Sequence, residues 1–309
     1  MNPHPMKALL LFSAWLLTPL SHAVEIKFEP VVPGVYAFIG EKGQRSYDNE
    51  GLNANIGLVV TPDGALLIDS GASAQGARQI HAAVKKITTQ PVRWIINTGG
   101  QDHRWLGNGY FIEQGAEVFA HADAKADMLA RGASHMASLR ETLKEKLDGT
   151  APTLPTHFLT GNDEVLSLGG WRVEIKHRGG GHTPGDSVVW LPQQGVLFSG
   201  DVVYVDRLLG IFPFSNTKHW VESFALIESL APGRIVPGHG EVCDLARAQA
   251  DTGQYLRALR AHMTTAVKDM TDISAAIQSF DAQPYMHLLN AAELHPGNAS
   301  RTYLEIERE

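Results

Sequence analysis

The sequence has almost no cysteine and no excess of positive charge. Its 309 residues include one cysteine, Cys243, which excludes an intrachain disulfide framework and a zinc site built from several thiolates. The formal net charge is −7, so no basic field is present to bind nucleic acid. Beyond residue 23, no apolar run is long enough to cross a membrane. We therefore expect a small-molecule substrate, no nucleic-acid partner and no membrane span in the mature chain.

Histidine is the residue type that stands out. The chain has 14 His, within a composition of 44% hydrophobic and 19% charged residues that is typical of a globular protein. Such a chain can bury a sizeable core in one large domain or two small ones.

Residues 1–23 have the three parts of a secretory signal peptide. Lys7 supplies the positive end, residues 8–17 are apolar, and Ser21-His22-Ala23 is a small-x-small cleavage site. We expect this segment to be removed and the mature protein to be periplasmic. An uncleaved N-terminal anchor is the alternative.

Strand and helix patterns alternate in two successive blocks. Hairpins are predicted at 56–68, 165–176 and 187–198, and strand–helix units follow in each block. This order predicts two sheets packed face to face with helices outside. Residues 246–277 read as helical and residues 280–309 carry little signal, so we expect residues 246–309 to form a helical extension packed on the same domain.

Three acidic or imidazole side chains stand in glycine-rich breaks after predicted strands. They are His182 in GGGHTPGD, Asp201 in FSGD and His239 in VPGHG. Glycine lets the backbone turn sharply where a strand ends, which aims the next side chain into a cleft. Imidazole and carboxylate are the ligands of a hydrolytic zinc or iron ion. The three settings together indicate a metal site.

These motifs, together with Leu67-Ile68-Asp69-Ser70-Gly71, resemble those of the metallo-β-lactamase fold superfamily. The resemblance implies that residues 24–245 form a four-layer αββα sandwich with a metal cleft at one edge of its two sheets. It also implies hydrolase activity, without fixing the substrate. The chain is further similar to exported metallohydrolases of sulfur-oxidation and quinoprotein systems.

The chain departs from the main signature of that superfamily, HxHxDH. The corresponding segment reads Asn97-Thr-Gly-Gly-Gln-Asp-His-Arg104. Without a gap, Gly99 and Gln101 replace the first two His, His103 takes the Asp position and Arg104 takes the last His. A shifted register would instead keep Asp102-His103 as the Asp–His pair of the family. We favour the gapless register because it needs no compensating insertion and deletion.

This register predicts one tightly bound ion, zinc or alternatively iron, held by His103, Asp201 and His239. Two His and a carboxylate with an open position are a common catalytic zinc set. His182 is either a fourth ligand or a nearby acid, base or substrate contact. The second metal site that the resemblance implies is degraded, and we expect Gly99→His with Gln101→His to restore it.

Five further residues are candidates for roles around the ion. Asp102 is either a general base or an anchor of the loop. Asp69 resembles a buried Asp that holds the metal loop through backbone N–H groups. Gln101 is a weak oxygen donor, and Arg104, beside Trp105 at the mouth of the cleft, either binds an anionic substrate group or forms a structural ion pair. Tyr204 follows Asp201 closely and is a candidate contact for the substrate or the ligands.

We therefore predict an exported hydrolase that uses metal-bound hydroxide on an ester, thioester, lactone or amide. β-Lactam hydrolysis is not expected because the three-His site is degraded. The alternatives are a non-hydrolytic metal-binding accessory protein of a periplasmic oxidation pathway, and a pseudo-enzyme that binds a partner.

Overall fold

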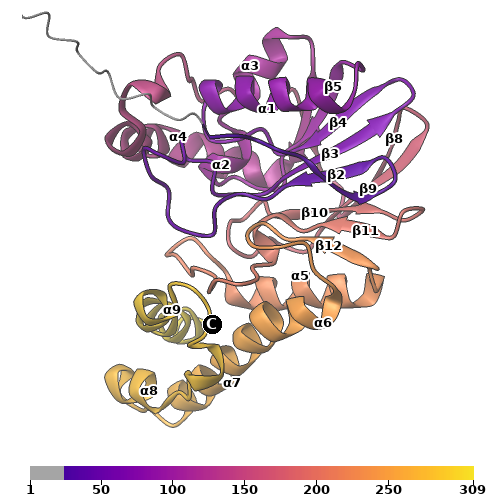
Figure 1. The fold of residues 1–309 in the computed structure, drawn as a ribbon. Helices are drawn as coiled ribbons and strands as arrows, with labels where there is room; N and C mark the ends of the chain where they lie inside the picture. The colour runs from indigo at the N-terminus through magenta and orange to yellow at the C-terminus, as the bar shows by residue number, and fades with distance from the viewer. Residues whose placement is uncertain (1–23) are drawn as a thin grey trace, which may run out of the picture.

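The computed structural model describes residues 24–309, so the predicted signal peptide lies outside the described residues. Two β-sheets pack face to face, and helices cover the outer face of each (Figure 1). This arrangement confirms the predicted four-layer αββα sandwich, and α7 to α9 confirm that helices follow it at the C-terminal end.

The first sheet has seven strands in sequence order. They are β1 (Glu29–Val32), β2 (Val35–Phe38), β3 (Ile56–Thr61), β4 (Gly64–Ile68), β5 (Val92–Ile96), β6 (Glu117–His121) and β7 (His157–Leu159). Strands β1 to β4 pair antiparallel, and β4 to β7 run parallel. The parallel strands end at one edge of the sheet, where the loops after β4 and β5 carry Asp69 and His103.

The second sheet has five strands. They are β8 (Asp163–Leu168), β9 (Trp171–His177), β10 (Ser187–Leu191), β11 (Val196–Phe198) and β12 (Arg234–Val236), in the order β12-β11-β10-β9-β8. Only β11 and β12 of this sheet pair parallel. Asp201 and His239 therefore follow neighbouring strands that end at the same edge.

Nine α-helices lie within residues 24–309. They are α1 (Ala74–Ile87), α2 (Asp102–Trp105), α3 (Asn108–Glu113), α4 (Ala122–Leu143), α5 (Thr217–Leu230), α6 (Leu245–Ala248), α7 (Gln254–Lys268), α8 (Ile273–Ser279) and α9 (Ala291–Ile306). Helix α1 packs Ile80 and Val84 on the first sheet, and α5 packs Trp220 and Phe224 on the second. A third apolar cluster, which includes Phe198, fills the space between the sheets.

The predicted hairpins all form, but the sequence did not predict the short elements β1, β2, β7, α2 and α3. Helix α9 lies within the predicted helical extension, although residues 280–309 carry little helical signal. Helix α9 contains Pro296 and Gly297, which are unfavourable in a helix interior. The predicted helix 246–277 runs from α6 through a π-helical turn at Gln249–Gly253 into α7, and it is interrupted only near Met270 (φ 52°), which separates α7 from α8.

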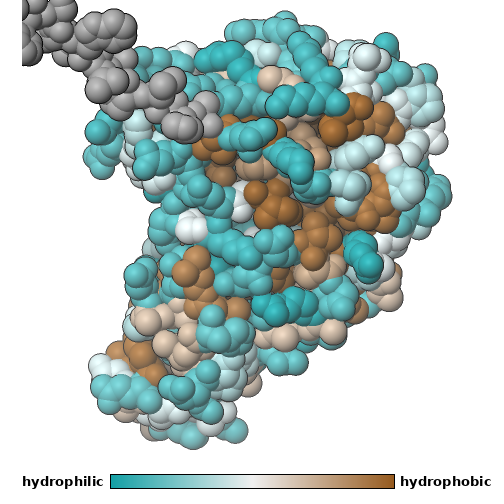
Figure 2. Space-filling view, viewed as in Figure 1, coloured by the Kyte–Doolittle hydropathy of each residue, from teal (hydrophilic) through white to brown (hydrophobic). Residues whose placement is uncertain are grey.

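None of the helices in residues 24–309 has both the length and the apolar character needed to cross a bilayer. Figure 2 shows hydrophilic residues over the helices at the top of the view, while hydrophobic residues reach the surface over the strands below them.

Candidate metal centre

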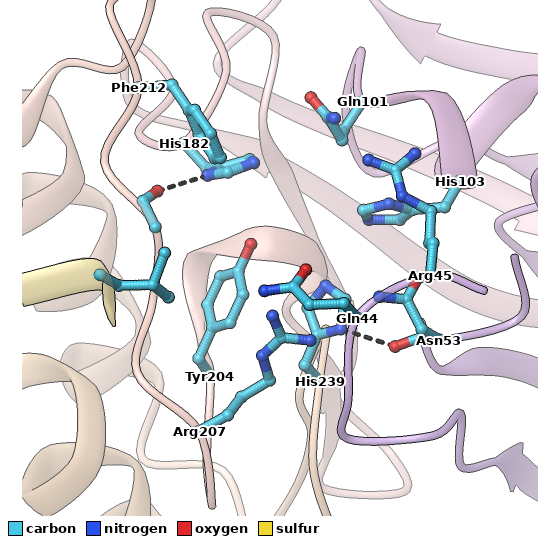
Figure 3. A pocket seen from close by; sticks show the side chains of 12 residues that line it. Gln44, Arg45, Asn53, Gln101, His103, His182, Tyr204, Arg207, Phe212 and His239 are labelled. Carbon is cyan, nitrogen blue, oxygen red and sulfur yellow. Dashed lines mark hydrogen bonds between the residues drawn. The ribbon is translucent and has the colours of Figure 1, made fainter. Parts of the chain in front are cut away.

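Three loops at one edge of the sandwich bring His103, Asp201 and His239 together. One ligand atom from each lies within 4.8 Å of the others. The Nε2 atom of His103 is 3.2 Å from Oδ2 of Asp201, and Nε2 of His239 is 3.2 Å from Oδ1 of the same carboxylate. All three residues are buried. Figure 3 shows His103 and His239 facing the same cavity.

The backbone around this cluster is tightly packed. A Cβ at Gly238 would lie 2.4 Å from the carbonyl oxygen of Gly200, so the loops after β11 and β12 can meet only where this side chain is absent. Asn55, which precedes β3 of the first sheet, holds the loop that follows β12. Its Nδ2 donates to the carbonyls of Pro237 and Gly240, each at 2.8 Å.

The hydrogen bonds of His239 show that these residues fit a divalent ion. Its Nδ1 lies 2.7 Å from the carbonyl oxygen of Asn53, a pure acceptor, so Nδ1 carries the proton. Burial lowers the pKa of His239 to about 3, and the ring is therefore neutral at pH 7. Its Nε2 lone pair then faces a carboxylate oxygen of Asp201, and a cation shared by both relieves that repulsion. Two tetrahedral zinc ligands are about 3.3 Å apart, close to the observed separation.

The carboxylate of Asp201 is held in its ionised form. Burial alone would raise its pKa, but Arg104 and then His103 outweigh burial, and the pKa lies well below its usual value. Arg104 binds both oxygens, with Nη2 2.6 Å from Oδ1 and Nε 3.2 Å from Oδ2. The hydroxyl of Tyr204 donates to Oδ1 at 3.0 Å. The orientation of Asp201 is thus fixed without the ion.

Arg104 forms the structural ion pair and does not reach the substrate cavity. The residue is 1% exposed, and its Nη1 also binds Asp69 at 2.9 Å. The expectation that Arg104 and Trp105 line the mouth is wrong. Neither lines the cavity, because Trp105 packs into the apolar cluster under α4 and donates its indole N–H to Gly100.

The remaining candidates take different places. Asp69 accepts from the backbone N–H of Thr98 at 2.7 Å, so it anchors the loop after β5. Asp102 pairs with Arg45 and accepts from the backbone N–H of His103, and it does not line the cavity. Gln101 does line the cavity, where its Oε1 accepts from Arg131 at 3.0 Å.

His182 faces the same cavity from the side opposite His103 (Figure 3). Its Nδ1 donates to the carbonyl of Gly210 at 3.0 Å, which leaves Nε2 as a lone pair. Burial lowers the pKa of His182 to about 4, so the ring is neutral at pH 7. His182 is not part of the cluster of ligand atoms around Asp201.

Packing fills the space beside Gly99, the residue that the gapless register aligns with the first His of the family signature. A Cβ at Gly99 would lie 2.3 Å from Oδ1 of Asp186, whose carboxyl occupies that space. A second ion in the Gly99→His/Gln101→His variant would therefore require the carboxyl of Asp186 to move, and that expectation stays a prediction.

The cavity above the cluster has a volume of about 80 Å³ and two unlike walls. Phe212 and Leu294 form an apolar wall, and Leu294 comes from α9. Arg45 and Arg207 line the other wall. Sequence reasoning did not identify Arg45 or Leu294, since they come from a loop and a helix far from Asp201 in the chain.

A second cluster was also missed. His121, Asp123 and His177 each offer a ligand atom within 4.8 Å of the others, although neither imidazole has a motif around it in the sequence. Cys243 supplies no thiolate at neutral pH, because burial raises its pKa to about 12.

A family model described as the metallo-beta-lactamase superfamily matches residues 49–239. Among curated proteins, the acyl-coenzyme A thioesterase MBLAC2 of Gallus gallus is 27% identical over 69% of this chain and 82% of its own length. Metallo-beta-lactamase IND-1 of Chryseobacterium indologenes is 26% identical over 73% of this chain and 88% of its own.

Solved structures share the fold. The mono-zinc form of metallo-beta-lactamase FIM-1 from Pseudomonas aeruginosa superposes with a TM-score of 0.59 at 23% identity, covering 76% of this chain and 96% of that protein. A metallo-beta-lactamase from Pontibacter korlensis gives a TM-score of 0.60 at 21% identity, covering 75% and 99%.

Proposed function

The chain belongs to the metallo-β-lactamase superfamily, and from this premise we propose that it is a metal-dependent hydrolase of an ester, thioester, lactone or amide. The observation that carries the proposal is His239, whose proton is fixed on Nδ1 while its Nε2 lone pair faces the carboxylate of Asp201. We further propose, from residues 1–23, that the protein is exported to the periplasm.

His103, Asp201 and His239 would hold one zinc ion, or alternatively iron. A divalent ion bound there lowers the pKa of a coordinated water toward 7 and polarises a carbonyl oxygen. The positive charge of Arg104 on Asp201 weakens binding of the ion relative to an unpaired carboxylate, since like charges repel. The lone pair on Nε2 of His182 accepts a hydrogen bond from water or substrate across the cavity.

The charges around the cavity favour an anionic substrate. Arg207 is 6% exposed, its Nε has no hydrogen-bond partner within residues 24–309, and its Nη1 donates only to the carbonyl of Gly43 at 3.1 Å. A buried guanidinium without a carboxylate is costly, and an anionic group beside it removes that cost. Phe212 and Leu294 opposite suit an apolar portion of the same substrate.

A metal-binding accessory protein is the second candidate. It is favoured by Arg104, which already engages both oxygens of Asp201, and by the closed position at Gly99. Such a protein would bind the ion at the same residues without turnover.

Hydrolysis of a panel of neutral and carboxylate-bearing thioesters, esters and lactones by the zinc-loaded protein tests the proposal. We expect turnover at pH 7, higher kcat/KM for the anionic member of each pair, and a loss of more than about 100-fold in His239→Ala, since changes outside the ligand set alone cost about 10- to 100-fold. His157→Ala, an exposed imidazole on β7, is the matched control. Zinc binding without turnover of any substrate would favour the accessory protein, and full activity in His239→Ala would reject the metal centre.

A further inference from the structure

A second His/Asp cluster lies where the two sheets meet, away from the candidate metal centre. His121 ends β6 of the first sheet, Asp123 stands in the first turn of α4, and His177 ends β9 of the second sheet. We propose that these three residues bind a divalent transition-metal ion of the zinc type, which tethers the two sheets.

The spacing of the ligand atoms suits one ion. The Nε2 atom of His177 is 3.1 Å from Oδ2 of Asp123, and Nδ1 of His121 is 3.8 Å from the same oxygen. These separations bracket the distance of about 3.3 Å between two ligands of a tetrahedral zinc ion. Two imidazoles and a carboxylate leave a fourth position for water.

The hydrogen bonds of the two imidazoles leave nitrogen atoms available. His177 places its Nδ1 2.9 Å from the carbonyl oxygen of Asp186, which fixes that proton and leaves the Nε2 lone pair toward Asp123. A metal-binding imidazole is oriented in this way by a carbonyl behind it. His121 is 4% exposed, and its Nε2 has no hydrogen-bond partner in the part of the chain that the structure describes. One nitrogen of this buried ring therefore lacks a hydrogen bond.

Binding requires His121 to turn. The two rings are stacked, with centroids 3.7 Å apart and planes at 17°, and lone pairs in nearly parallel planes cannot both point at one ion. The Nδ1 atom of His121 accepts a long hydrogen bond, 3.3 Å, from the backbone N–H of Asp123 at the start of α4, and within residues 24–309 its Nε2 makes none. Binding therefore breaks this one bond as the ring turns Nδ1 toward the ion.

Access from solvent also favours the site. The side chain of Asp123 is 57% exposed and borders a cavity of about 350 Å³ that also contacts Gly179 and His219. An ion can therefore enter from solvent.

Metal binding to a variant without the candidate metal centre tests the proposal. Tag-free His103→Ala/His239→Ala protein is freed of metal with a chelator and titrated with Zn²⁺ by calorimetry. We expect one equivalent to bind, and Tm to rise by about 5 °C or more at zinc concentrations of about 100 times Kd. Adding Asp123→Asn abolishes both effects, whereas Asp148→Asn, the same change at an exposed carboxylate, leaves them intact.

Absence of zinc binding in the His103→Ala/His239→Ala protein, or binding that survives both Asp123→Asn and His121→Gln, would overturn the proposal. Should that double variant not fold, Asp123→Asn in the otherwise unchanged chain lowers the bound zinc by one equivalent if the site exists, and leaves it unchanged if it does not. The result is independent of the proposed hydrolase, because an ion lost in Asp123→Asn but retained in His239→Ala belongs to this cluster alone.

Discussion

At the scale of single residues, the site is defined as much by fixed charge as by ligands. Arg104 is the residue that the gapless register aligns with the last His of the family signature. The sequence left open whether its guanidinium binds substrate or forms an ion pair. Arg104 is buried between Asp69 and Asp201 and pairs with both, so it forms the structural ion pair and does not bind substrate.

Arg104→Met should lower the free energy of unfolding by about 3–5 kcal/mol, because two buried carboxylates lose the arginine that pairs with both. Urea denaturation of the metal-free protein measures this change. Arg172→Met, which removes a half-exposed arginine from a surface pair with Glu174, should cost less than about 1 kcal/mol. Equal losses in the two variants would contradict the assigned role of Arg104.

Gly99→Ala should destabilise the fold by about 1–3 kcal/mol, because the new Cβ would lie 2.3 Å from the carboxyl of Asp186. Gly43→Ala is the matched control, since nothing lies within 4 Å of its Cβ position. Denaturation of both variants in parallel separates packing from the general effect of replacing glycine. A Gly99→Ala protein as stable as the Gly43→Ala protein would show that the space is not closed.

Asp186 should give the folding stability a specific pH dependence. Burial, followed by Asp201, raises its pKa to about 8, whereas the unfolded chain titrates near 3.9. Between these values the native state holds the extra proton, so the free energy of unfolding falls as pH rises, by up to about 3 kcal/mol between pH 5 and pH 7. Asp186→Asn keeps a neutral side chain of the same shape and should remove this fall. Identical pH profiles of stability in the two metal-free proteins would refute the assignment.

At the scale of secondary-structure elements, α9 shapes the cavity although its sequence resembles a loop. Pro296, Gly297 and Asn298 interrupt any helical pattern, but Asn298 is fully buried and binds the loop before α5. Its Oδ1 accepts from the N–H of Ile211 at 2.7 Å, and its Nδ2 donates to the carbonyl of Leu209 at 2.8 Å. Tertiary contacts that the sequence does not encode locally therefore stabilise this helix.

Asn298→Ala should cost about 2–3 kcal/mol, because two buried backbone groups lose their partner. It should also speed amide hydrogen exchange of Ile211, whose N–H donates to this side chain. Thr302→Ala on the same helix removes a buried hydroxyl that bonds only within α9 and should leave that exchange rate unchanged. Unaltered exchange of Ile211 in Asn298→Ala would contradict the claim that Asn298 of α9 holds the loop before α5.

At the scale of the whole molecule, the sequence predicted the four-layer architecture and the hairpins because their apolar periods and turns are local. Asp201 and His239 could be identified for the same reason, since each follows a short strand and a glycine. Arg45 and Leu294 could not, because only the fold brings a loop and a distant helix to one cavity. The cluster of His121 and His177 likewise depends on two sheets meeting and has no sequence signature.

The central claim is that His103, Asp201 and His239 hold one catalytic divalent ion. An anomalous difference map at the zinc edge, from crystals of the zinc-loaded protein, tests it most directly. The account predicts one peak in the main cavity, within about 2.0–2.2 Å of Nε2 of both imidazoles and of a carboxylate oxygen of Asp201. An empty cavity, or a peak bound by His182 and Gln101 without His103, would contradict it.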